Sequence, residues 1–182
     1  MKKEFLERRL DVKAFALAAT SQSGHDALSC HERLAQEAQG PVEGLMVHWT
    51  ARGELRTSAS GADEVWLHLE ASTRLPLTCQ RCMGPVDIDV ASERWFRFAV
   101  DEDAAAALDD ESEEDVLVLS KEFDLASLVE DELLMALPLV PRHETCPVDV
   151  KLAVADPGFE AESSVKAHPF AALASLKLGK SS

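Results

Sequence analysis

Four side chains that can act as metal ligands occur in two pairs, each with two residues between its members: Cys79 with Cys82, and His143 with Cys146. Cysteines at this spacing can direct both thiolates at one tetrahedral ion through a tight turn, and the second pair completes a Cys3His set suited to zinc. The two pairs lie far apart in the sequence, unlike those of a self-contained finger. A zinc site therefore requires the fold to bring them together.

The Cys79–Cys82 pair has two other interpretations. A thioredoxin-like dithiol has its first cysteine at a helix N-terminus within a βαβ unit, whereas Gly84-Pro85 here predicts a turn into another strand, which disfavours a redox site. The pair can also be a strand-end turn with partly buried free thiols, because unpaired cysteine is commonly buried. The sequence leaves zinc and free thiols as alternatives. Cys30 lies apart and is expected to be a packed thiol.

The elements that must position these residues are strands and helices of an α+β fold. From Val42 to Val100 apolar and polar residues alternate with a period of two, which predicts antiparallel strands. We expect an open antiparallel sheet or partial barrel with one buried face, on which His48 and His68 share the polar side. The predicted strands cover 45–52, 65–72, 86–90, 95–100 and 116–119, and the predicted packing helices lie near 26–39 and 125–137.

Capping residues define the two predicted helices. Asp26 is the expected N-cap of the first, and Asp124 is that of the second, which Pro138 ends. In the second helix Glu130 and Asp131 are expected to face solvent. Glu132 falls on the apolar stripe and needs a polar partner there.

Residues 101–115 contain nine Asp or Glu and no Lys or Arg. This composition predicts a disordered, self-repelling mobile loop whose deletion has little effect on stability. The loop is either a solvated insertion or a binding segment for a basic partner. The candidate partner-binding residues are Asp109, Asp110, Glu111, Glu113, Glu114 and Asp115.

The whole chain is acidic as well. Its 182 residues carry a net charge of −15, which excludes phosphate neutralisation as the main binding mode and favours basic polypeptides as partners. The length fits a single domain over 1–182, with 155–182 as an extended tail. The charged start and the lack of a long apolar run favour a cytoplasmic protein. Catalysis has little support, because no phosphate-binding glycine loop or nucleophile elbow is present.

Several of these residues also form a pattern that resembles the bacterial YceD family, described as large ribosomal RNA subunit accumulation proteins. The resemblance covers about 73–177, and its most specific part runs from Glu-Asp-Glu at 130–132 to Pro-x-x-Pro-x-His at 138–143. His168 departs from the family, where Asn usually precedes the proline. The residues that carry the resemblance are Cys79, Arg81, Cys82, Glu130, Asp131, Glu132, Pro138, Pro141, His143, Cys146, Pro169 and Phe170.

The resemblance implies a non-enzymatic role in the synthesis, processing or stability of 23S (large-subunit) ribosomal RNA. The family's gene tends to lie beside one for a small basic large-subunit ribosomal protein, and a chain of −15 is expected to bind such a protein better than RNA. Two alternatives are direct RNA binding and a zinc-dependent enzyme. The first would use a local strip of arginines: Arg74, Arg81, Arg94 and Arg97.

Overall fold

The computed structural model describes residues 9–58, 61–110, 112–149, 151 and 154. Contacts divide the chain into two units, 1–146 and 147–182, and the elements all belong to the first. The tail predicted for 155–182 lies outside the described residues. The elements are α1 (Val12–Leu17), β1 (Ser21–Ala27), η1 (Leu28–Cys30), α2 (Glu32–Glu37), β2 (Met46–Thr57), β3 (Asp63–Thr78), β4 (Pro85–Ala99), α3 (Glu102–Asp109), β5 (Asp115–Val118) and α4 (Leu125–Met135).

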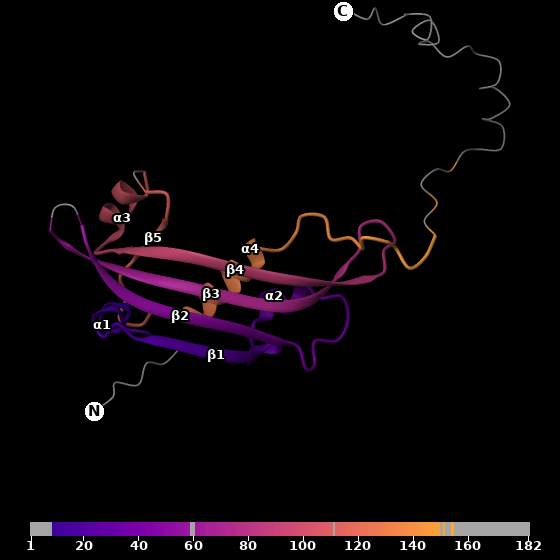
Figure 1. Ribbon diagram of the computed structural model, residues 1–182, viewed down its shortest axis with the longest axis horizontal. Coiled ribbons are helices and arrows are strands. Elements are labelled where there is room, and N and C mark those ends of the chain that lie inside the picture. The colour runs from indigo at the N-terminus through magenta and orange to yellow at the C-terminus, as the bar shows by residue number, and fades with distance from the viewer. Residues whose placement is uncertain (1–8, 59–60, 111, 150, 152–153, 155–182) are drawn as a thin grey trace, which may run out of the picture. The chain divides into compact units, whose positions relative to one another are not determined.

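The strands form one open sheet in the order β1-β2-β3-β4-β5 (Figure 1). The first three pairings are antiparallel, and β5 runs parallel to β4. The fold is therefore α+β as predicted, but the sheet is mixed and not wholly antiparallel. A parallel neighbour needs a crossover connection, and α3 lies in that connection.

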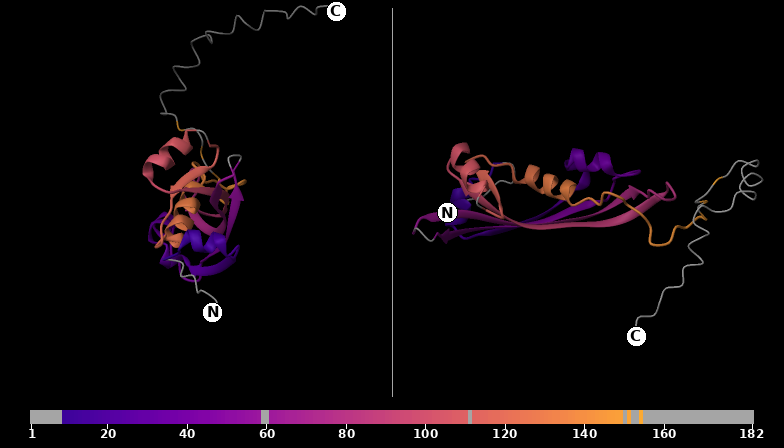
Figure 2. Two further views of the ribbon diagram at one scale, coloured as in Figure 1. Left: turned by 90° about the vertical axis from the view of Figure 1, so that its left-hand side faces the viewer. Right: turned by 90° about the horizontal axis from the view of Figure 1, so that it is seen from above.

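Among the described residues, the helices lie on one side of the sheet and leave the other side uncovered (Figure 2). The alternation of buried and exposed side chains follows from this arrangement, with Val47, Trp49 and Ala51 facing the helices and His48 and Arg52 facing away. The largest fully buried side chains come from both the helices and the strands. None of the helices in the described part of the chain is long and apolar enough to span a membrane.

The long strands β3 and β4 carry the metal-ligand turn between them. The sequence predicted two strands, 86–90 and 95–100, where the structure has the single strand β4. Adjacent residues of β4 face opposite sides of the sheet, since Phe96 is buried against the helices and Trp95 stacks on His68 on the uncovered side. The expectation that His48 and His68 share the polar side is confirmed.

The helix predicted from Asp26 to Gln39 is wrong over its first half. Residues 21–27 form the edge strand β1, and Asp26 accepts a hydrogen bond from Trp49 Nε1 at 2.8 Å in place of capping a helix. A Cβ on Gly24 would lie 2.5 Å from the Trp49 ring, so glycine allows β1 to approach that indole. Pairing with β2 thus overrides the weak helical stripe, and only Glu32–Glu37 is α-helical.

The disordered loop predicted for 101–115 is also wrong where the structure describes it. Glu102–Asp109 forms α3, and Asp115 begins β5. The side chain of Asp101 accepts from the Ala104 N–H as an N-cap, Glu102 and Asp103 favour the first turn electrostatically, and the alanines that follow are strong helix formers. Ala105 is buried, so packing adds to this local preference.

Candidate metal centre

The first pair of candidate ligands lies in the turn between β3 and β4. Cys79 donates its N–H to the Gly84 carbonyl at 2.9 Å, and Met83 donates its N–H to the Cys79 carbonyl at 2.8 Å. Met83 has a φ of 60°, a left-handed conformation that closes the turn. These two bonds bend the chain tightly enough to bring Cys79 and Cys82 to the same site.

The second pair returns to this turn after α4 has ended. Gln80 donates its N–H to the Pro141 carbonyl at 2.8 Å. The Arg81 guanidinium then donates through Nη2 to the carbonyls of His143, at 2.7 Å, and Glu144, at 3.2 Å. Residues between the cysteines therefore hold the backbone that carries the other two candidate ligands.

The four candidate ligands converge as predicted. One ligand atom from each of Cys79, Cys82, His143 and Cys146 lies within 4.8 Å of the others. Cys79 Sγ is 4.0 Å from Cys146 Sγ, and Cys82 Sγ is 3.5 Å from His143 Nδ1. A tetrahedral zinc ion with bonds of about 2.0–2.3 Å separates its ligands by roughly 3.3–3.8 Å, so only small inward shifts would complete the shell.

Burial and hydrogen bonding make the cysteines chemically different. Burial raises the pKa of the Cys79 thiol, but N–H groups of Cys82, His143 and Arg81 stabilise its thiolate and lower its pKa to about 5. Burial and contacts with Cys82 and Cys79 raise the pKa of Cys146. Cys79 is thus a thiolate at neutral pH, the form that binds metal.

The structure also bears on the two interpretations that compete with zinc. Cys79 follows the end of strand β3 and is not at a helix N-terminus, which removes the thioredoxin-like context. All four cysteines of the chain are free, and the 4.0 Å between Cys79 and Cys146 is about twice an S–S bond. Cys30 is exposed, so its predicted packing is wrong.

The acidic block 130–132 on α4 serves the fold. Glu130 is buried, contrary to the prediction, and accepts from the N–H groups of Arg33 and Leu34 at 2.7 and 3.1 Å. The Arg33 guanidinium also donates to Glu130 through Nε and Nη2, and it pairs with the half-exposed Asp131. Hydrogen bonding outweighs burial and lowers the pKa of Glu130.

Glu132 has the polar partner that its place on the apolar stripe required. Its carboxylate accepts from Ser92 Oγ at 2.9 Å and lies 3.8 Å from an Arg94 nitrogen. Helix α4 is therefore bonded to α2 by Glu130 and to β4 by Glu132. No pattern in the sequence pointed to Arg33 as the partner of Glu130, because the two residues lie 97 positions apart and Arg33 is in a short helix.

The candidate partner-binding residues of the acidic segment lie in different local settings. Asp109 ends α3, and Asp110, Glu113 and Glu114 are exposed. Asp115 forms an ion pair with Arg94, with an N···O distance of 2.6 Å. Glu111, like Pro169 and Phe170 of the closing motif, lies outside the described residues, while Pro138 and Pro141 lie in the segment from α4 to the Cys/His cluster.

Comparison with known proteins finds a family whose pattern matches this chain. Residues 67–177 match the family described as large ribosomal RNA subunit accumulation protein YceD. The protein of that name from Haemophilus influenzae is 39% identical over 103 residues, which are 56% of this chain and 59% of that relative. No solved structure matches significantly. The matched region includes all four candidate ligands and the acidic block of α4.

Proposed function

The chain belongs to the YceD family, and on this premise we propose that it supports accumulation of 23S ribosomal RNA by binding a basic large-subunit ribosomal protein. The observation that carries the proposal is the net charge of −15. An acidic surface attracts lysine- and arginine-rich proteins and speeds their association. The effect on RNA is then indirect and non-enzymatic, and the place of action is the cytoplasm, where bacterial ribosomes assemble.

The proposed mechanism is temporary neutralisation. The acidic chain covers basic side chains that would otherwise bind RNA indiscriminately. Ribosomal RNA then displaces it during assembly, because the denser charge of RNA and the release of its counterions favour the same cations. This mechanism predicts binding that weakens as the salt concentration rises.

Direct RNA binding through the predicted arginine strip has less support. Arg74 lies with Asp87 and Asp89, and Arg97 with Glu64, on the uncovered side of the sheet. The other two arginines of the strip lie elsewhere: one bonds carbonyls at the Cys/His cluster, and one pairs with carboxylates of β5 and α4, as described above. All four therefore have intramolecular partners and do not form one cationic surface.

The tryptophans on the uncovered side also lack the exposure that base stacking needs. Trp66 is buried, and the guanidinium carbon of Arg56 lies 4.2 Å from the Trp66 ring centroid and 4.0 Å from that of Trp95. A nucleobase would have to displace this arginine to stack on the rings. This arrangement supports a protein partner over RNA.

We further propose that the Cys/His cluster holds one zinc ion with a structural role. Four protein ligands, Cys79, Cys82, His143 and Cys146, would fill a tetrahedral shell and leave no position for water. A closed site ties the β3–β4 turn to the segment after α4 and does not activate a nucleophile. A zinc-dependent enzyme, which needs an open position, therefore has less support.

A binding assay with two ligands tests the proposed function. Proteins extracted from purified large ribosomal subunits are expected to bind the full chain at low salt and to be released as salt rises. Fragments of 23S RNA are expected to bind no better than about 10⁻⁴ M at physiological salt. Submicromolar binding to naked 23S RNA, with no ribosomal protein present, would overturn the proposal. Elemental analysis of the purified chain, with one zinc expected per molecule, tests the metal.

A further inference from the structure

The uncovered side of the sheet divides into two halves of different chemistry. We call the side chains of β1–β4 that point away from the helices the open face. In the half near Trp66 and Trp95, arginines pair with Glu54 and Glu64 of the same face or stack on the rings. The arginines of that half therefore already have partners within the open face.

The other half carries an excess of exposed carboxylates. Four carboxylate side chains in this half are 57 to 85% exposed: Glu70, Asp87, Asp89 and Glu93. Arg74 forms ion pairs with two of them, Asp87 and Asp89. We call these four carboxylates and the side chains between them the acidic half. Its net charge is negative in the described structure, whereas the cations of the first half are already engaged.

The strand register places two of these carboxylates side by side. Glu70 on β3 pairs directly with Glu93 on β4, an arrangement that is unfavourable for like charges. The His68 ring, from the neighbouring row, contacts both carboxylates, with Nδ1 3.7 Å from Glu70 and Nε2 3.2 Å from Glu93. An added cation would therefore relieve repulsion that the open face retains.

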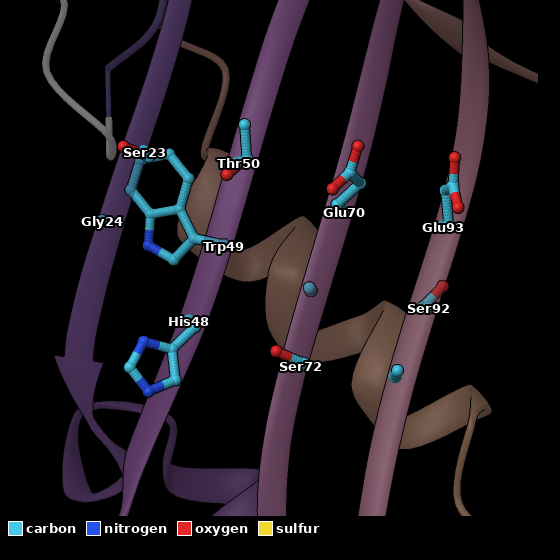
Figure 3. Close-up of a pocket in the computed structure, with 11 residues that line it drawn as sticks. Ser23, Gly24, His48, Trp49, Thr50, Glu70, Ser72, Ser92 and Glu93 are labelled. Atoms are coloured by element: carbon cyan, nitrogen blue, oxygen red, sulfur yellow. The ribbon is translucent and has the colours of Figure 1, made fainter.

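A hollow lies beside this carboxylate pair. It has a volume of about 600 Å³ and is lined by residues of four adjacent strands (Figure 3). Next to the Glu70–Glu93 row, the register pairs His48 with Ser72 and Ser72 with Ala91, so small side chains separate that row from Arg74 and Asp89. Long aliphatic side chains can lie over this floor and reach carboxylates on either side.

We propose that the acidic half of the open face is the docking surface for a lysine- or arginine-rich polypeptide segment; this rests on the proposed function and names its binding surface. Charge complementarity selects the occupant. A nucleic acid would bring phosphates to four exposed carboxylates, and a second copy of the chain would bring the same acidic surface. A basic segment supplies the missing cations and places its aliphatic stems over Ser72 and Ala91.

The test compares two pairs of substitutions that remove the same charge. E70Q/E93Q alters the acidic half, and E32Q/E37Q alters exposed carboxylates of α2, on the helix-covered side of the sheet. The probes are a fluorescein-labelled peptide of alternating lysine and glycine, measured by anisotropy, and the protein fraction of purified large ribosomal subunits. We expect E70Q/E93Q to raise Kd about tenfold and E32Q/E37Q to raise it at most about twofold.

Folding does not confound this comparison. E70Q/E93Q removes a like-charge pair, so its Tm is expected to equal or exceed that of the unaltered chain. Equal weakening by both double variants would overturn the docking surface and leave the proposed function standing. Failure of the unaltered chain to bind the ribosomal proteins would overturn both.

Discussion

The Cys/His cluster and the Glu130–Arg33 contact both join segments that lie far apart in the sequence, but they differ in what they leave unpaired. Glu130 accepts four hydrogen bonds from Arg33 and Leu34, so its charge is neutralised within the chain. In the Cys/His cluster three sulfurs and a ring nitrogen lie within 4.8 Å of one another. The guanidinium of the neighbouring Arg81 is hydrogen-bonded to the backbone carbonyls of His143 and Glu144. The Glu130–Arg33 contact therefore stabilises the fold without a further partner, whereas the Cys/His cluster is arranged to bind an added ion.

The difference separates two roles within one family pattern. The acidic block at 130–132 looks like a functional motif in the sequence, yet its two buried carboxylates attach α4 to α2 and β4. Neighbouring residues hold the cysteine and histidine pairs in position, through hydrogen bonds from the Gln80 N–H to the Pro141 carbonyl and from the Arg81 guanidinium to the His143 carbonyl. The pattern therefore combines residues that hold the fold with residues that we propose hold zinc.

The largest expected effect is the loss of stability when the proposed metal is removed. Stripping zinc with a chelator should lower the free energy of unfolding by about 4 kcal/mol, if free zinc had stood at roughly 1,000 times its Kd. Cys82→Ser should abolish that difference, because it removes a ligand. Denaturant unfolding with and without chelator measures both.

Cys30→Ser is the matched control for the zinc experiment. Cys30 is exposed and is not among the four clustered ligands, so this variant should keep the full response to the chelator. An unaltered chain whose stability does not change on metal removal would show that the cluster is a set of free thiols.

The second largest expected effect tests how much the hydrogen bonds between Glu130 and α2 stabilise the fold. Glu130→Ala should destabilise the chain by about 3 kcal/mol, because it leaves two N–H groups of α2 and the Arg33 guanidinium without their acceptor. Asp131→Ala removes a half-exposed partner of the same arginine and should cost under about 1 kcal/mol. Similar losses in urea unfolding would contradict the distinction between the two carboxylates.

A smaller effect concerns the residue that supports the metal ligands without touching the ion. Arg81→Met should weaken zinc binding about tenfold, since Arg81 fixes the carbonyls of His143 and Glu144. Arg74→Met removes a guanidinium from the open face and should leave zinc affinity unchanged. Competition with a calibrated chelator measures both, and equal affinities in the two variants would remove Arg81 from the site.

Local signals in the sequence predicted much of the fold. Period-two alternation located β2 and β3, and Asp124 with Pro138 located α4, whose N-cap accepts from Ser127 N–H. The segment 101–115 was predicted wrongly because its charge density hid a capped run of alanines. Strand β1 was missed because its pairing with β2 depends on Gly24 beside Trp49, a contact that no local pattern contains.

The sequence predicted the four candidate ligands but not the hydrogen bonds that hold them in place. Spacing alone selected Cys79, Cys82, His143 and Cys146, and the structure brings them together. The bond from Gln80 to Pro141 joins distant segments through backbone atoms, which residue types do not reveal. Burial of Glu130 was equally hidden, because a carboxylate is expected inside only when its partner is known.

The smallest effect is a pH dependence that sharpens the assignment of Glu130 to the fold. Its pKa in the folded chain is lowered by hydrogen bonds from Leu34 and Arg33, which outweigh the opposing effect of burial. A carboxyl whose folded pKa lies below its unfolded value, about 4.3 for Glu, contributes stability above that unfolded value. This contribution is lost as pH falls from the unfolded pKa through the folded pKa, because the unfolded state takes up its proton at the higher pH.

Glu130→Gln provides the comparison for this pH dependence. The amide keeps the size of the side chain but does not titrate, so the variant should be less stable than the unaltered chain at pH 7. The difference should shrink as pH falls below about 4, because protonation removes the same charge from Glu130. Urea unfolding across this range measures the difference. A constant difference between the two chains would show that the charge of Glu130 does not contribute to joining α4 and α2.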